Sequence, residues 1–394
     1  MNDQSQPQPE SVPASRPIPD GSAPALDHLR IQIDQIDQQI VGLLAQRKQV
    51  VEQVATIKQQ HGLPTFHPAR EENLISARRG QATRAGLDPD YIEDLFRTVM
   101  RHSRVGQLST LSRRGARPGA KVLIVGGRGS MGSFFARWFR QSDCEVRILD
   151  VDDWSQVSVL VSGIDLALLA VPIPVTAQVA RQLGPHLPPR CIFADITSLK
   201  QAPVTAMLQA HAGPVVGLHP LFGPITSTMD KQIVVVSPGR DEADCQWLLD
   251  QLTIWGNFLV ETPAAEHDEI MGIVQSLRHF ATFALGQFLH SRKVPISRTL
   301  ELSSPIYRLE MGMVGRLFAQ DPALYAEIIF ATPERQALLK DFIHSMTQNL
   351  AMVERGDKAE FITEFHRVAE WFGPFSEQAL RESSFLIEKL VHRF

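Results

Sequence analysis

The pattern of apolar and polar positions over residues 26–111 is that of helices alone. Apolar residues recur at steps of three and four through 26–60, which predicts one long helix ended by the turn at 61–64. A second helix is predicted over 68–84, and an N-cap aspartate at Asp88, followed by a first-turn proline, begins a third. We therefore expect an all-helical N-terminal domain of three helices.

Between residues 120 and 262 the pattern changes to short apolar runs that alternate with helical stretches. The predicted strands are 122–125, 146–149, 165–171, 191–195, 215–218 and 233–236. This alternation predicts a mostly parallel sheet wrapped by helices, an α/β domain of the Rossmann type.

From residue 263 onward strand signals vanish. Long amphipathic segments such as 266–291 and 359–372 predict an all-helical C-terminal domain over 263–394. A basic segment rich in Pro and Gly, 112–119, is expected to link the first two domains. Residues 1–25 are polar and proline-rich and are expected to be disordered.

Composition is ordinary for a globular protein and narrows the function classes. The chain has 394 residues, 44% of them hydrophobic, and a net charge of −4, so no bulk positive field recruits nucleic acid or an anionic membrane. We expect no signal peptide, no membrane span and a cytoplasmic location. The three cysteines, Cys144, Cys191 and Cys245, show no disulfide or metal spacing, so we expect reduced structural thiols and no metal site.

A glycine-rich turn follows the first predicted strand. Gly127, Gly129 and Gly132 form a G-x-G-x-x-G pattern that opens a helix, which is typical of dinucleotide-binding loops. In this pattern the first glycine makes the turn, the second lets the backbone approach the phosphates and the third allows close helix packing. The loop residues Arg128, Ser130 and Met131 complete the expected cofactor site.

An acid ends the next predicted strand. Asp150 is placed to accept the ribose hydroxyls of NAD and would repel a 2′-phosphate. Arg128 in the turn is the one candidate partner for such a phosphate. We therefore expect NAD rather than NADP.

Three cations lie among the apolar positions of the first helix. Arg47 and Lys58 are 11 residues apart and point within roughly 20° of each other, whereas Arg30 points roughly 80–100° away from both. A helix of this length overhangs a domain of its own size, which predicts an intertwined dimer in which Arg30 reaches the partner's site. The alternative is a coiled-coil dimeriser whose cations are merely solvated.

These residues support a resemblance to two families. The segment from Leu29-Arg30 through Arg47, Lys58, Arg70-Glu71, Ser103 and Gln107 resembles the all-helical chorismate mutases. The glycine loop, the segment from Asp195 to Lys200, the segment around His219, and the segment holding Arg308 and Arg316 resemble prephenate dehydrogenase. Joined in this order, they resemble the bifunctional enzymes of bacterial tyrosine biosynthesis from about residue 26 to the end of the chain.

The first resemblance implies which residues bind chorismate. Its rearrangement to prephenate moves no proton, so the site must fold a dicarboxylate and stabilise charge on the breaking ether. By resemblance, Arg47 and the partner's copy of Arg30 hold the carboxylates, Lys58 and Gln107 donate to the ether oxygen, Glu71 takes the hydroxyl, and Arg70 and Ser103 flank the site. Position 67, often an acid in related mutases, is His67 here and is given no catalytic role.

The second resemblance implies a hydride transfer from prephenate to NAD with loss of CO₂. His219 follows a predicted strand, where ligands bind open α/β sheets, and is expected to take the proton of the ring hydroxyl. By resemblance, Ser198 contacts that hydroxyl, Lys200 is a weaker substrate ligand, and Arg316, helped by Arg308, binds the carboxylate. His279 resembles a position implicated in feedback inhibition by L-tyrosine, although a core histidine fits the same pattern.

Two other functions remain open from the sequence. One is a β-hydroxyacid-type NAD(P) dehydrogenase with a helical dimerisation arm, although such enzymes use a central lysine. The other is a non-catalytic NAD sensor that dimerises through its N-terminal helices.

Overall fold

The computed structural model describes residues 23–61, 68–111, 115–226 and 228–391. Most of the expected N-terminal tail, part of the expected linker and His67 lie outside the described residues. The chain divides into two compact units between Leu111 and Ser112, and each is described by itself.

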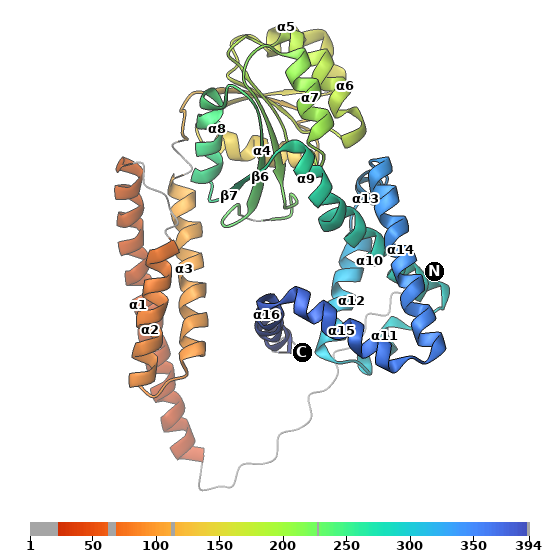
Figure 1. Ribbon diagram of the computed structural model, residues 1–394. Coiled ribbons are helices and arrows are strands. Elements are labelled where there is room, and N and C mark those ends of the chain that lie inside the picture. The colour runs from red at the N-terminus through yellow and green to blue at the C-terminus, as the bar shows by residue number, and fades with distance from the viewer. Residues whose placement is uncertain (1–22, 62–67, 112–114, 227, 392–394) are drawn as a thin grey trace, which may run out of the picture. The chain divides into compact units, whose positions relative to one another are not determined.

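The first unit consists of three described helices, as the pattern predicted. They are α1 (Ala23–His61), α2 (Pro68–Arg84) and α3 (Pro89–Leu111) (Figure 1). Asp88 accepts a hydrogen bond from the backbone of Asp90 at 2.8 Å, which confirms the expected cap of α3. The α3 helix packs against both α1 and α2. Much of α1 nevertheless stays uncovered: Leu29, Ile33, Ile36, Ile40 and Leu43 are about half exposed or more.

The second unit begins with a seven-stranded sheet in the order β2-β1-β3-β4-β5-β6-β7. Its strands are β1 (Lys121–Val125), β2 (Glu145–Leu149), β3 (Leu166–Leu169), β4 (Ile192–Asp195), β5 (Val215–Pro220), β6 (Ile233–Arg240) and β7 (Phe258–Glu261). All neighbouring pairs are parallel except β5 and β6. The predicted α/β class is confirmed. The short edge strand β7 was missed.

Helices cover both faces of this sheet (Figure 1). They are α4 (Ser130–Gln141), η1 (Val151–Gln156), α5 (Val157–Leu160), α6 (Ile173–Leu183), η2 (Gly184–His186), α7 (Gln201–Ala210) and α8 (Glu242–Ile254). Aromatic residues of α4, among them Phe135 and Phe139, join Trp255 in one hydrophobic core. A second core holds Leu183 of α6 and Met207 of α7.

The rest of the second unit is helical, as predicted. Its elements are α9 (Ala264–Met271), a π-helix η3 (Gly272–Leu277), α10 (Arg278–Ser291), α11 (Ile296–Glu301), α12 (Pro305–Phe318), α13 (Pro322–Ile329), α14 (Pro333–Arg355), α15 (Lys358–Phe372) and α16 (Pro374–Val391). The segment 266–291 was expected as one regular helix, but the π-helix interrupts it. None of the described helices is long and apolar enough to cross a membrane.

Candidate active sites

The glycine-rich turn joins β1 to α4 and corrects one predicted role. Gly126, not Gly127, has the left-handed backbone, with φ of 77°. A Cβ atom on Gly126 would lie 2.5 Å from the carbonyl oxygen of Ala170, whereas one on Gly127 would press on Ile148 at 2.9 Å. Gly126 therefore makes the turn, and Gly127 keeps the turn close to β2.

The start of α4 fits a bound pyrophosphate. A Cβ on Gly132 would lie 2.2 Å from the carbonyl oxygen of Gly126, so only glycine lets the helix approach the turn this closely. Gly129 is the N-cap residue and no side chain caps the helix. The first-turn amides, including those of Ser130 and Met131, are therefore free of a side-chain cap and face the position where phosphates bind helix N-termini.

Asp150 lies beside this turn, as predicted. Its carboxylate accepts hydrogen bonds from the backbone of Arg128 at 3.1 Å and of Val151 at 3.0 Å. The Arg128 guanidinium is paired with Asp153 at 2.9 Å, and this contact raises the pKa of Arg128 and lowers that of Asp153. Sequence reasoning missed Asp153, which holds the one loop cation that a 2′-phosphate would need.

His219 lies near the carboxyl end of β5, as predicted, and is only 3% exposed. Its Nδ1 is 2.8 Å from Nε2 of His267, a residue of α9, and its Nε2 is 3.2 Å from the side-chain amide of Gln275 in the π-helix. Burial, together with Lys200, His267 and Arg335, holds the pKa of His219 well below its ordinary value. The imidazole is therefore neutral at neutral pH, the state that a general base requires.

The loop after β4 carries Ser198 and Lys200. Ser198 is half-buried, and its predicted contact with the substrate hydroxyl stays a prediction. The structure corrects the part expected of Lys200. Its side chain is fully buried and its ammonium is paired with Asp195, whose carboxylate also accepts a hydrogen bond from the Thr197 hydroxyl at 2.5 Å. Lys200 thus acts on His219 as a buried positive charge instead of lying open to substrate.

Arg335, at the start of α14, is a buried cation that sequence reasoning missed. It is 3% exposed, and its Nη1 donates to the carbonyl oxygen of Ile328 at 2.8 Å. Its Nη2 has no hydrogen-bond partner among the described residues. Burial lowers the pKa of this guanidinium, and the nearby Asp268 opposes the effect. No motif marked it, because one arginine in a helix pattern is ordinarily exposed.

The other predicted residues of the helical domain lie on α10 and α12. Arg308 donates to the carbonyl oxygen of Leu300 at 2.6 Å, and Arg316 is exposed. Their predicted hold on the substrate carboxylate stays a prediction. His279 is buried with its ring 4.7 Å from that of Tyr325, and burial lowers its pKa to about 4. Tyr325 also lines an apolar cavity of about 650 Å³ between α10, α12, α13 and α14.

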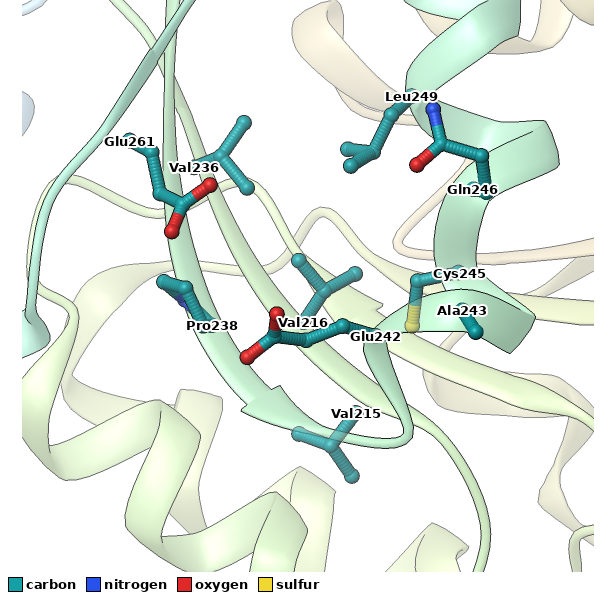
Figure 2. A pocket seen from close by; sticks show the side chains of 10 residues that line it. All are labelled: Val215, Val216, Val236, Pro238, Glu242, Ala243, Cys245, Gln246, Leu249 and Glu261. Atoms are coloured by element: carbon teal, nitrogen blue, oxygen red, sulfur yellow. The ribbon is translucent and has the colours of Figure 1, made fainter.

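A second, smaller cavity of about 150 Å³ lies between β5, β6 and α8 (Figure 2). Figure 2 shows the carboxylates of Glu242 and Glu261 and the thiol of Cys245 along its wall. Burial raises the pKa of Cys245 to about 12, which makes the thiol unreactive and fits the expected structural role. None of its lining residues belongs to the glycine loop or to the group around His219, so we assign this cavity no part in catalysis.

In the first unit, the structure brings together most of the residues expected around chorismate. The Arg47 guanidinium donates to the Ser103 hydroxyl, which joins α1 to α3. Burial and the positive charge of Arg70 lower the pKa of Lys58, and the Glu71 carboxylate opposes them, so these three side chains lie near one another. Burial and Arg78 likewise lower the pKa of Arg47. Such crowded cations are arranged for an anion.

Gln107 and Arg104 are buried polar residues of the first unit, whereas Arg30 is exposed. Gln107 is buried, and its side-chain oxygen has no hydrogen-bond partner among the described residues. Arg104, which sequence reasoning missed, is 7% exposed and forms an ion pair with Glu71. Arg30 is not among this group: its side chain is 65% exposed and pairs with Asp27 at 3.1 Å. In the described parts of the chain, no group of His, Cys, Asp or Glu is arranged to hold a metal ion.

Three segments of the chain match known families. Residues 29–108 match type II chorismate mutases. Residues 140–260 match the nucleotide-binding domain of prephenate dehydrogenase, and residues 263–367 match its dimerization domain.

Relatives that combine these parts are similar over most of their length. The T-protein of Enterobacter agglomerans is 44% identical over 366 residues, which cover 92% of this chain and 97% of the relative. The T-protein of Haemophilus influenzae is 41% identical over 365 residues, 93% of this chain and 97% of the relative. Among solved structures, prephenate dehydrogenase from A. aeolicus, in complex with hydroxyphenyl propionate and NAD+, has a TM-score of 0.50 at 19% identity. That match covers 64% of this chain and 97% of that one, and it supports the fold alone.

Proposed function

The chain belongs to the T-protein family of bifunctional chorismate mutase and prephenate dehydrogenases, and from this premise we propose how its residues carry out the two reactions. It converts chorismate to prephenate and then oxidises and decarboxylates prephenate with NAD+. The products are 4-hydroxyphenylpyruvate, CO₂ and NADH. Membership decides against a β-hydroxyacid dehydrogenase and against a non-catalytic NAD sensor. We propose residues 26–111 as the mutase domain, 120–262 as the NAD-binding domain and 263–394 as the substrate and dimerisation domain.

We propose that the mutase site is the cation cluster of the first unit. Arg47, aligned by Ser103, grips one carboxylate of chorismate, and Lys58 and Gln107 donate to the ether oxygen as charge develops there. Arg70 flanks the site. Glu71, held by Arg104, accepts the substrate hydroxyl. The observation that supports this assignment best is the cluster itself, in which Ser103 holds the Arg47 guanidinium and the side chains of Lys58, Arg70 and Glu71 lie near one another.

Arg30, the cation expected at the second carboxylate, lies outside this cluster in its own protomer. Arg30 lies far out on α1, among apolar residues that are half exposed. An apolar helix face of this length is typical of a partner-covered surface. We propose a homodimer in which α1 pairs with its counterpart and Arg30 completes the partner's site.

For the dehydrogenase, we propose that the glycine loop 127–132 and Asp150 hold NAD+, which supplies the acceptor for the hydride leaving C4 of the ring. His219 takes the proton of the C4 hydroxyl through Nε2 while Ser198 hydrogen bonds the same oxygen. As the C4 oxygen becomes a carbonyl, the bond to the ring carboxylate breaks and its electrons make the ring aromatic. The imidazolium of His219 then transfers this proton to the phenolate oxygen, so the reaction consumes no net proton. Arg316 and Arg308 bind the carboxylate.

The test of the whole proposal is a product analysis. Purified protein is incubated with chorismate, with and without NAD+. We expect prephenate alone without the cofactor, and 4-hydroxyphenylpyruvate and CO₂ with it. Arg47→Ala should block both products from chorismate but leave oxidation of added prephenate intact. Formation of 4-hydroxyphenylpyruvate by Arg47→Ala from chorismate at the normal rate would overturn the assignment of the mutase site.

We propose that L-tyrosine inhibits the dehydrogenase near His279. Tyrosine shares the hydroxybenzyl group of the product, so a site shaped for the product accepts it. His279 follows Gln275 by about one helical turn, contacts Tyr325 beside the 650 Å³ cavity, and so links that cavity to the group around His219. His279→Asn should weaken inhibition at least tenfold in the tyrosine concentration required. Unchanged inhibition would remove His279 from this role.

We further propose a cytoplasmic location. Cys144, Cys191 and Cys245 are buried free thiols, as expected of a protein kept in a reducing compartment. Cell fractionation with an antibody against the chain tests this, and recovery from outside the cytoplasm would contradict it.

A further inference from the structure

Three side chains in hydrogen-bond contact, those of His219, His267 and Asp268, connect the sheet to the helical domain. Nδ1 of His219 is 2.8 Å from Nε2 of His267, and Nδ1 of His267 is 2.8 Å from the carboxylate of Asp268. His219 and His267 are 3% and 1% exposed, so no water competes with these contacts. The Asp268 carboxylate also accepts hydrogen bonds from the backbone of Lys200 at 2.8 Å and of Gln201 at 3.0 Å.

The order of donors and acceptors along these three residues fixes the tautomer of His219. A carboxylate only accepts, so Nδ1 of His267 carries the proton toward Asp268. A neutral His267 then presents a lone pair at Nε2, which obliges Nδ1 of His219 to be the donor. The remaining nitrogen, Nε2 of His219, is left with its lone pair. The side-chain amide of Gln275 lies 3.2 Å from it and can donate to that lone pair.

We propose that His267 and Asp268 are positioning residues of the dehydrogenase. They hold His219 with its proton on Nδ1 and its basic lone pair on Nε2, where the substrate hydroxyl takes the place of the Gln275 amide, and they stabilise the imidazolium that forms. This inference rests on the proposed role of His219. Asp268 has a second role. Its hydrogen bonds from the backbone amides of Lys200 and Gln201 hold the start of α7 and therefore the loop that carries Ser198.

The charges around His219 explain why it requires such support. Lys200 and Arg335 are buried cations that disfavour its protonation, and His267, if it were charged, would do the same, so a neutral His267 bonded to Asp268 is required; Asp195 is the partner of Lys200. Burial raises the pKa of Asp268, but the hydrogen bonds from His267 and from the two backbone amides outweigh it and keep the carboxylate ionised. Asp268 is thus the negative group that reaches His219, and it does so through His267.

Two substitutions of His267 separate positioning from folding. His267→Leu removes the acceptor but keeps the buried volume, and we expect kcat of the dehydrogenase to fall about 100-fold, the scale of losing an oriented base. His267→Gln keeps an acceptor for His219, and we expect it to recover kcat to within about tenfold of the wild type. The KM values for prephenate and NAD+ should change by less than threefold in both. His344→Leu, at an exposed histidine of α14, is the control, and thermal unfolding checks that each variant is folded.

Asp268→Asn distinguishes positioning from a purely structural role, because only a positioning role predicts a change in the pH profile of kcat and in the tautomer of His219. With an amide in place of the carboxylate, the imidazolium of His219 loses its support, so the acidic limb of the kcat profile should shift to lower pH as the plateau falls. Nitrogen NMR of imidazole-labelled protein should show His219 protonated on Nδ1 in the wild type and on Nε2, or on both in exchange, in Asp268→Asn.

The proposal is overturned if His267→Leu keeps kcat within twofold of the wild type. It is also overturned if Asp268→Asn lowers kcat with the acidic limb and the tautomer of His219 unchanged. Failure of the proposed function looks different, because then His219→Asn itself would retain dehydrogenase activity.

Discussion

The buried cations Lys200 and Arg335 disfavour protonation of His219, the residue that we propose as the base of the dehydrogenase. The proposed reaction requires the neutral imidazole, and burial together with Lys200, His267 and Arg335 lowers the pKa of its conjugate acid. Activity is therefore fully present above the ordinary histidine pKa and is lost only as pH falls through the lowered value. We expect kcat/KM for prephenate to be flat from pH 8 to pH 6.5 and to fall at more acidic pH. A profile already half-lost at pH 7 would contradict this.

His219→Asn should remove the dehydrogenase and spare the mutase. Asparagine can donate to substrate but cannot take its proton, and loss of a general base costs about 10²–10⁴-fold in kcat. The mutase moves no proton and lies in a separate unit, so its rate should stay within twofold of the wild type. Both rates are measured on the same preparation. A drop of less than tenfold in dehydrogenase kcat would rule out His219 as the base.

The choice of cofactor also depends on single residues. We propose that Asp150 binds the ribose, and Asp153 is paired with Arg128, so we expect wild-type kcat/KM to be higher with NAD+ than with NADP+. Asp153→Asn should release Arg128 and reduce this preference by about twofold to fivefold, the scale of an exposed ion pair. Asp152→Asn is the matched control, since it removes the same charge nearby without a bond to Arg128. Equal effects of the two variants would show that only net charge matters.

At the scale of elements, the junction of β1 and α4 depends on the absence of one side chain. A Cβ on Gly132 would overlap the carbonyl oxygen of Gly126, which is rigid backbone. We expect Gly132→Ala to lower the free energy of unfolding by about 1–3 kcal/mol, as overpacking does, and to weaken NAD+ binding. Gly312→Ala in α12 is the control, because nothing lies within 4 Å of its Cβ and alanine favours a helix. Urea unfolding and NAD+ titration measure both, and equal behaviour of the two variants would contradict the packing argument.

Elements with a strong period could be predicted from the sequence, and those set by tertiary contacts could not. The three N-terminal helices and six of the strands follow from apolar spacing and from Asp88 as a cap. The strand β7 was missed because it is a four-residue, largely exposed edge strand with no buried alternation. The π-helix around Gln275 was missed because one wider turn barely changes a helical apolar pattern, although such turns often mark functional sites.

The same limit applies to the candidate sites. Motifs identified His219, Ser198 and the glycine loop because their residue types follow strand ends in a readable order. Spacing cannot reveal His267 and Asp268, since only the packing of α9 against α7 brings them to β5. Nor does spacing show that Lys200 points inward to Asp195.

At the scale of the whole molecule, the two units carry separate chemistry, and the first leaves its longest helix largely uncovered. Arg47 and Lys58 turn toward α2 and α3, whereas Arg30 stays with Asp27 at the surface. This division matches the angular separation along α1 and is the basis of our proposal that each mutase site is built from two chains. It also makes the intertwined dimer testable by mixing subunits.

Arg30→Ala and Lys58→Ala homodimers should each be nearly inactive as mutases, because each leaves a carboxylate or the developing ether charge without its donor. In a mixed dimer of the two variants, one site contains both substitutions and the other site contains neither. Roughly half of the mutase activity should therefore return per mixed dimer, with the dehydrogenase unchanged throughout. Arg47→Ala mixed with Lys58→Ala is the matched control: both residues lie in one protomer's cluster, so each site of that dimer keeps one lesion and stays inactive. If subunit exchange is confirmed by mass and no activity returns with Arg30→Ala, then Arg30 acts within its own chain and the shared site is wrong.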